Sequence, residues 1–594
     1  MRVFICSLLV CGLAAPSVPA STPKDKGVLS AATDATKDTK ATSTVAAPAA
    51  TNPPAVPAGA TTPSANNGTA TGANAAVEGE LQQLRDLLEA QQAEIAALKE
   101  RLNGTATPNS AVGSPTTSGA QSGNATVLPS GNGTANLTVP TQQSAEARSG
   151  EAEGKLSFRI GGADFAPGGF VDFSNYWRST NVGSGFGTSF NTIPFNNTSA
   201  GGLTEDHVTA VNSRLSLKVT SHVAGGDVLG YVETDFNGNQ PTNLLINRNG
   251  ATLRLRLFLA DYRRGSWEIL GGQDWTMLTP DRVGIAALPA DLFTTLDIDA
   301  NNGVGLVSAR QAQVRLVYHP TEYWAMGVSV ENPDQYTGTA LTFPSAFNPA
   351  TGTTYTNQVD QGTGTSSPAY FPDIIAKITR DQLVRGNDWH FEVAGLLTSD
   401  KLYTPAAVAG VGATQAKTGG GIAANIDLAL THKFHVIANS FWSDGGGRYI
   451  YALGPNFVVA QDPASLNFVP SLVHAGSGLA GFEYQATRKF QWFAYYGGAY
   501  FGRDFSIDPA TGKPVGYGYT GSANSENRAI QEISTGFTHS FWKSENYGAL
   551  QLINQISWVT RAPWYVAPAT ATTPGAPKNA NAAVVYVDLR YVIP

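Results

Sequence analysis

The sequence predicts an all-β fold, a transmembrane antiparallel β-barrel of about sixteen strands, preceded by a short α-helical coiled coil and disordered linkers. Three observations after residue 152 carry this prediction. Apolar and polar side chains alternate with a period of two, short and long connections alternate between the segments, and Trp and Tyr gather near segment ends. A soluble sandwich has no reason to sort its connections by length in this way.

Composition agrees with a membrane barrel and excludes other classes. The 594 residues carry a net charge of −7 and only 14% charged residues, which excludes nucleic acid as a bulk partner. No run approaches the ~20 apolar residues that a spanning helix needs. Alternating strands keep their apolar side chains spread through the sequence, so they leave no such run.

The N-terminus predicts a secretory signal peptide over residues 1–20. Arg2 precedes a short apolar stretch, and a small-residue cleavage motif stands at 18–20. A lipid attachment at Cys11 is a weaker alternative. Because Cys6 and Cys11 are the only cysteines, the chain after the signal can form no disulfide, thiolate metal site or cysteine nucleophile.

Two disordered linkers are predicted at 21–76 and 103–152, because these stretches of Ala, Thr, Pro, Ser and Asn cannot bury enough apolar surface to order. Between them, 77–102 has the heptad spacing of a parallel coiled coil, which implies an oligomer. A single amphipathic helix is the alternative. The predicted seam consists of Leu81, Leu84, Leu88, Ile95, Leu98 and Leu102, interrupted by Gln91.

The barrel domain is predicted over 153–594, with sixteen candidate strands. These are 168–178, 209–221, 228–236, 251–261, 267–276, 309–318, 323–331, 373–381, 389–398, 421–431, 434–442, 474–487, 489–502, 530–540, 547–560 and 583–593. Short turns alternate with long polar loops, as in a barrel whose two ends differ. The long loops are 179–208, 277–308, 332–372, 399–420, 443–473, 503–529 and 561–582.

The stretch TLRLRLFLADYRRGSW, which begins at Thr252, shows how alternate residues are assigned to the two faces of a strand. Leu253, Leu255, Leu257 and Leu259 occupy alternate positions, so a strand places all four on one face. In a membrane barrel these leucines face lipid, and the arginines between them face a water-filled lumen.

Several stretches resemble Gram-negative general porins. NSRLSLKVTSHVAGGDVLGYVETDFNG (212–238) and LRLRLFLADYRRGSWEILGGQDWTMLTP (253–280) resemble the early porin hairpins, the second leading into an inward-folding third loop. ARQAQVRLVYHP (309–320) and VSVENPD (328–334) resemble the DcaP-like trimeric porins, which also carry a periplasmic coiled coil. The chain departs from that pattern at Pro594, where such barrels usually end in an aromatic residue.

The resemblance implies a sixteen-stranded homotrimer in the outer membrane, with its N-terminal region in the periplasm. It implies passage of small hydrophilic solutes, with a leaning toward anions of the dicarboxylate type. The coiled coil could contact a periplasmic or cell-wall partner.

Ten residues are the candidates for the lumen. Inward parity predicts a basic wall of Arg214, Lys218, Arg254, Arg256, Arg315 and Lys377. Opposite it, loop 277–308 offers Asp281, Asp291, Asp297 and Asp299. Facing charges of opposite sign would orient dipolar solutes and give anions a favourable path. Alternatively, the arginines pair with Glu233, Asp235, Glu268 or Asp274 on neighbouring strands and only brace the barrel.

The sequence predicts no enzyme, no cofactor and no metal site. Its eight histidines are scattered singly, without metal-ligand spacing, and no nucleophile elbow is evident. An outer-membrane hydrolase is a remote alternative. The other rival is a structural or adhesive protein that tethers the envelope, in which the barrel serves mainly as an anchor and the linkers provide reach.

Overall fold

The computed structural model describes residues 156–238, 252–288, 303–338, 341–347, 355–359, 369–406, 412–450, 454–570 and 575–594. The predicted signal peptide, both linkers and the coiled coil lie outside these described residues. Within them, no helix has the length and apolarity to cross a membrane.

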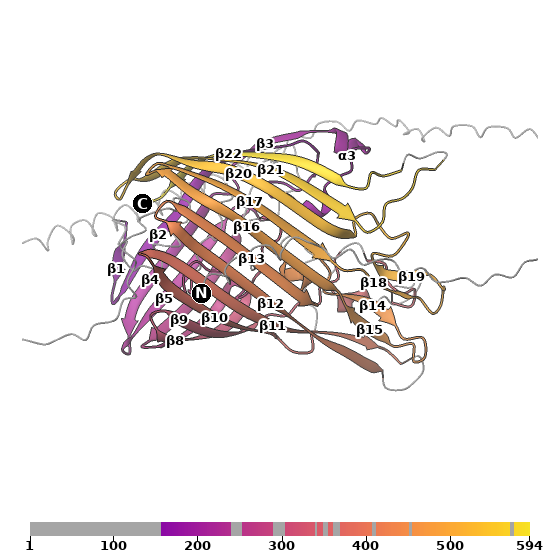
Figure 1. The fold of residues 1–594 in the computed structure, drawn as a ribbon. Coiled ribbons are helices and arrows are strands. Elements are labelled where there is room, and N and C mark those ends of the chain that lie inside the picture. The colour runs from indigo at the N-terminus through magenta and orange to yellow at the C-terminus, as the bar shows by residue number, and fades with distance from the viewer. Residues whose placement is uncertain are drawn as a thin grey trace, which may run out of the picture. The chain divides into compact units, whose positions relative to one another are not determined.

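Sixteen strands of the described chain form one closed antiparallel barrel, which confirms the predicted fold and strand number. Figure 1 shows them following one another around the sheet in chain order. The strands are β2 (Ala163–Arg178), β4 (Arg214–Val223), β5 (Gly226–Asp235), β6 (Arg254–Arg264), β7 (Trp267–Trp275), β8 (Arg310–Thr321), β9 (Trp324–Glu331), β10 (Asp373–Val384), β11 (Asn387–Thr404), β12 (Ala413–Thr431), β13 (Phe434–Asp444), β16 (His474–Thr487), β17 (Phe490–Phe501), β20 (Asn527–Ser544), β21 (Gly548–Pro563) and β22 (Ala580–Val592).

The barrel closes where its last strand, β22, pairs with its first, β2, from Phe170↔Val592 to Arg178↔Val584. On the inner side of this seam, the Arg590 guanidinium donates to Oδ2 of Asp172 at 2.7 Å. The pair joins residues 418 positions apart in the chain. The seam therefore depends on contacts between the two ends of the barrel domain.

Two short strands extend β2. β1 (Phe158–Ile160) pairs with its beginning, and β3 (Glu205–Thr209) pairs with its last five residues. The sequence predicts one strand over 209–221, whereas the structure separates β3 from β4. A hydrogen bond from the Ser213 amide to the Ala210 carbonyl forms a turn between them.

Alternation along the strands separates an apolar outer face from a polar inner face. On β8, Gln311, Gln313 and Arg315 are buried, while Val314 is 57% and Leu316 47% exposed. Buried here means covered by other side chains and loops inside the barrel. Exposed large apolar residues on an outer surface are what a hydrocarbon environment requires.

The prediction that four leucines of β6 share one face is wrong for two of them. Leu253 and Leu255 are exposed, but Leu257 and Leu259 are each only 5% exposed and lie inside. The pairing with β5 shifts between Thr234↔Leu255 and Glu233↔Leu257, which leaves an extra residue in β6. Such a β-bulge reverses the parity of everything after it. Phe258, 59% exposed, takes the outward position instead.

The two ends of the barrel differ as predicted. One end has tight turns such as Ala224-Gly225, where both residues adopt positive φ, as type I′ hairpin turns require. The other end has long loops with structure of their own, opposite β1 in Figure 1. The elements in these loops are η1 (Phe190–Thr192), α3 (Ser199–Gly202), η2 (Thr356–Gln358), η3 (Gly447–Tyr449) and the hairpins β14 (Phe457–Gln461) to β15 (Phe468–Leu472) and β18 (Asp504–Ile507) to β19 (Pro514–Tyr517).

Candidate functional site

The loop between β7 and β8 folds into the barrel. We call its described parts, residues 277–288 and 303–308, the inner loop. Met277, Leu278, Ile285 and Leu288 in the first part are all at most 5% exposed. A loop on the outer surface would leave such apolar side chains in water, so burial against the inner wall explains their presence.

The first part of the inner loop is held by charged side chains of β10 and β11. Asp281 accepts a hydrogen bond from Nζ of Lys377 at 3.0 Å, and its amide donates to the Glu392 carboxylate at 3.1 Å. Lys377 also lies 3.1 Å from Glu392. The Gly284 amide donates to Oδ2 of Asp381 at 3.0 Å. These groups form a connected polar network in which the loop backbone is a donor.

Arg282 attaches the inner loop to two further strands of the barrel, β12 and β16. Its guanidinium donates to Oε1 of Glu483 at 2.5 Å and to Oδ2 of Asp427 at 3.3 Å. Only 11% of its side chain is exposed, and Glu483 is fully covered. The Tyr495 hydroxyl also donates to Glu483, at 3.0 Å. A fork that reaches two carboxylates fixes both position and orientation.

The two parts of the inner loop contact opposite arcs of the barrel. Leu288 packs against Leu259 and Leu270 of β6 and β7. The Val304 amide donates to Glu532 of β20 at 2.9 Å, and Leu306 packs among side chains of β13, β16 and β17. In the strand order of the barrel, β6 and β20 lie far apart on either side of β11. The inner loop therefore narrows the lumen.

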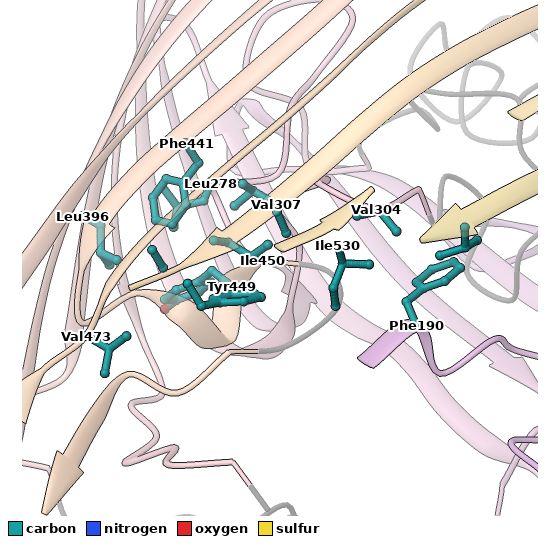
Figure 2. Close-up of a cluster of buried hydrophobic side chains, with 14 of the residues drawn as sticks. Phe190, Leu278, Val304, Val307, Leu396, Phe441, Tyr449, Ile450, Val473 and Ile530 are labelled. Atoms are coloured by element: carbon teal, nitrogen blue, oxygen red, sulfur yellow. The ribbon is translucent and has the colours of Figure 1, made fainter. Parts of the chain in front are cut away.

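A second loop packs on the inner loop from the long-loop end. In Figure 2, Leu278, Val304 and Val307 lie in one apolar cluster with Tyr449 and Ile450. Tyr449 is the last residue of η3, and Ile450 follows it. The Ser308 amide donates to the Tyr449 carbonyl at 2.9 Å, so the contact is also polar. Wall residues complete the cluster in the same view, namely Leu396, Phe441, Val473 and Ile530.

Carboxylates lie beside the arginines of the predicted basic wall. Arg254 donates to both oxygens of Asp235, at 3.0 and 2.6 Å, with 29% of its side chain exposed. Arg256, 1% exposed, contacts Glu233 and also Asp235. Arg214 lies 3.8 Å from Glu233.

The rest of the predicted set divides between two regions. Arg315 lies 3.2 Å from Asp274, and its guanidinium also donates to carbonyls of Ala286 and Trp275. Lys377 is the member that binds Asp281, away from the others. Lys218 lies half-buried on β4. Asp291, Asp297 and Asp299 lie outside the described residues.

Sequence reasoning missed Arg282, whose neighbours on β12 and β16 are far away in the chain. Because 277–288 has no regular period, no parity argument could orient this side chain. It also missed two histidines that lie beside carboxylates bound to the inner loop. His390 lies 2.7 Å from Asp381 and 3.1 Å from Glu392, and His435 lies 3.3 Å from Asp427.

Within the described residues, no group of three or more His, Cys, Asp or Glu side chains is placed to hold a metal ion. The charged groups of the interior are instead arranged as ion pairs and hydrogen-bonded networks. Such an arrangement can exclude or attract ions by field and size.

No family model matches the sequence, and the comparison with curated proteins gives no match. Several solved structures are similar to this chain. The outer-membrane channel DcaP of Acinetobacter baumannii has 18% identity over 73% of this chain and 99% of its own, with a TM-score of 0.48. In vitro folded OmpT of Vibrio cholerae has 10% identity over 74% and 99%, with a TM-score of 0.39. OprB of Pseudomonas putida has 11% over 73% and 94%, with a TM-score of 0.36.

Proposed function

We propose that the protein is a porin of the outer membrane, a channel through which small hydrophilic solutes diffuse passively, rather than an enzyme. The observation that carries the proposal is a closed barrel with an apolar outer face, a polar inner face and a loop bound inside it. A barrel of this kind satisfies all its backbone groups within hydrocarbon and leaves its interior to water.

Aromatic side chains at both ends of the outer face support the membrane location. Trp267 and Tyr318 lie in contact near the short turns, with ring centroids 4.6 Å apart and the ring planes tilted by 37°. Trp442, 62% exposed, and Trp558, 51% exposed, lie toward the long-loop end. Amphipathic rings favour the two membrane–water interfaces, so these residues mark the edges of the buried band. In the proposed orientation, the short turns and the N-terminal region are periplasmic.

The inner loop is the proposed constriction, and glycines of the wall allow it to approach. A Cβ on Gly497 of β17 would overlap the carbonyl oxygen of Val304. We expect Gly497→Val to displace residues 303–308 and raise the single-channel conductance in planar bilayers.

The control is Gly271→Val on β7, where a Cβ would meet nothing within 4 Å. This variant should keep the conductance of the parent. Equal conductance of the Gly497→Val channel and the control would show that these residues do not limit the passage.

A preference for small anions, dicarboxylates in particular, is what the sequence alone predicts, and it would depend mainly on Arg254 and Arg256. If the partly exposed Arg254 guides anions, Arg254→Ala should lower the permeability ratio of chloride to potassium, read from the reversal potential in a salt gradient. Arg264→Ala, on the turn between β6 and β7, is the matched control. An unchanged ratio in Arg254→Ala would mean that this arginine only pairs with Asp235 and stabilises the barrel.

The proposal is tested by bilayer conductance of the detergent-extracted oligomer, for which the resemblance to trimeric porins implies a homotrimer. We expect discrete steps of conductance in solutions of small ions. Larger solutes should be excluded from the channel or should block it. The rival function, a tether or adhesin anchored by a plugged barrel, would give little conductance. Crosslinking to the cell wall through residues 77–102 would then become the relevant measurement.

A further inference from the structure

The inner loop is bound mainly by carboxylates of the barrel strands. Six of them accept hydrogen bonds from inner-loop donors, and we call these the acidic wall. They come from strands β9 to β12, β16 and β20. The members are Glu331, Asp381, Glu392, Asp427, Glu483 and Glu532.

Negative charge exceeds positive charge at this wall. Lys377 and Arg282 contact it as permanent cations, and His390 and His435 contact it as titratable groups. The six carboxylates outnumber these four side chains even if both imidazoles are protonated. Asp281 of the inner loop adds a further carboxylate beside Lys377.

The arc from β4 to β8 lacks such an excess. It has six basic side chains on the inner face, Arg214, Lys218, Arg254, Arg256, Arg263 and Arg315, and six carboxylates, Asp227, Glu233, Asp235, Asp261, Glu268 and Asp274, with His319 beside Glu268. The fields of opposite charges in contact largely cancel at distances much longer than their separation. Of these two arcs, the acidic wall carries the larger net charge.

Arg282 is the loop residue that moderates this net charge. Its guanidinium bridges Asp427 and Glu483, and these two carboxylates belong to strands β12 and β16 with β13 between them. It thus pins residues 277–288 against the wall and neutralises part of its charge.

We propose that the lumen selects for small cations through the acidic wall, and that Arg282 is the positioning residue that sets the strength of this selection. The inference rests on the proposed channel function and deepens it. Arginine suits the role because it stays charged at any relevant pH and its fork reaches two carboxylates at once.

The test is the reversal potential of the full-length oligomer in a potassium chloride gradient. The parent channel should prefer potassium over chloride. Arg282→Gln should raise that preference and the conductance, because Glu483 and Asp427 lose the guanidinium that they share and the inner loop loses one of its attachments. Arg282→Lys keeps the charge and should restore the parent preference, whereas Glu483→Gln should weaken it. Arg264→Gln, a turn arginine, should change nothing.

A chemical version of the test uses channels that are already assembled. Because no cysteine follows Cys11, Arg282→Cys introduces a unique thiol into the barrel domain. A trimethylammonium methanethiosulfonate reagent should then lower the potassium preference of this variant, and a sulfonate reagent should raise it. Conductance insensitive to both reagents and unchanged by Arg282→Gln would overturn the role of Arg282.

The outcomes separate the two levels of inference. A parent protein that inserts but does not conduct contradicts the channel function itself. A parent that conducts and prefers chloride leaves the channel function intact, contradicts the cation preference and favours the basic wall as the selective element.

Discussion

Replacing Arg178 by methionine is expected to lower the free energy of unfolding by about 3–5 kcal/mol, because it removes one partner of a buried ion pair. Arg178 ends β2 and is fully covered. Its guanidinium donates to Glu205 at 2.7 Å, to Thr188, and to the carbonyls of Gly185 and Phe186. Without it, Glu205 is left buried without its arginine partner, and loop 179–208 loses one of its attachments to the barrel.

The measurement is equilibrium unfolding in urea after refolding into detergent or lipid vesicles. Arg159→Met is the matched control, because Arg159 and Asp164 form an exposed pair 3.6 Å apart. Exposed pairs contribute about 0–1 kcal/mol. A loss for Arg178→Met no larger than that of the control would mean that the other contacts of the loop, such as the hydrogen bond from Arg561 to the Ile193 carbonyl, are enough to anchor it.

Replacing Val314 by arginine tests which side of the wall meets lipid. Val314 lies in the middle of β8, outward and 57% exposed, opposite Gly271 in the middle of β7. An arginine facing hydrocarbon at the bilayer midplane costs about 2–4 kcal/mol, and near the interface about 0–1. We therefore expect a clear loss of stability in vesicles for Val314→Arg.

Leu383→Arg is the control for depth. Leu383 is 60% exposed and lies at the end of β10, next to the turn at Arg385 and Gly386, which both have positive φ. This arginine can reach the interface, so the loss should be small. Equal losses at the two positions, or no loss at either, would contradict a membrane-embedded outer face.

The sequence predicts the barrel because the period of two is a local property of each strand. Gln311, Gln313 and Arg315 on β8 show this, since their parity alone places them inside. The parity fails on β6, where the bulge before Leu257 follows from pairing with β5 and leaves no local signal. The predicted strand ends are also wrong where the pairing between two strands continues into a loop. β11 extends to Thr404, and β12 begins at Ala413.

The candidate site was predictable only in part. Basic side chains on strands could be assigned an inward direction, but their carboxylate partners depend on register between strands. The loop contributes Arg282 as well as acidic residues, and its attachment to Glu483 joins positions 201 apart in the chain. No spacing in one sequence encodes such a contact. The charge balance of the lumen therefore follows from the three-dimensional structure.

The seam between β2 and β22 has a consequence for biogenesis. Because the first strand finds its permanent neighbour only at the opposite end of the domain, hydrogen-bonding edges stay open until the whole polypeptide has been delivered. Contacts of such long sequence separation form slowly. A truncated chain that lacks β22 would keep two unsatisfied edges and be prone to aggregate. The intermediate therefore needs shielding during transit, and insertion has to be coupled to the arrival of the C-terminal hairpin.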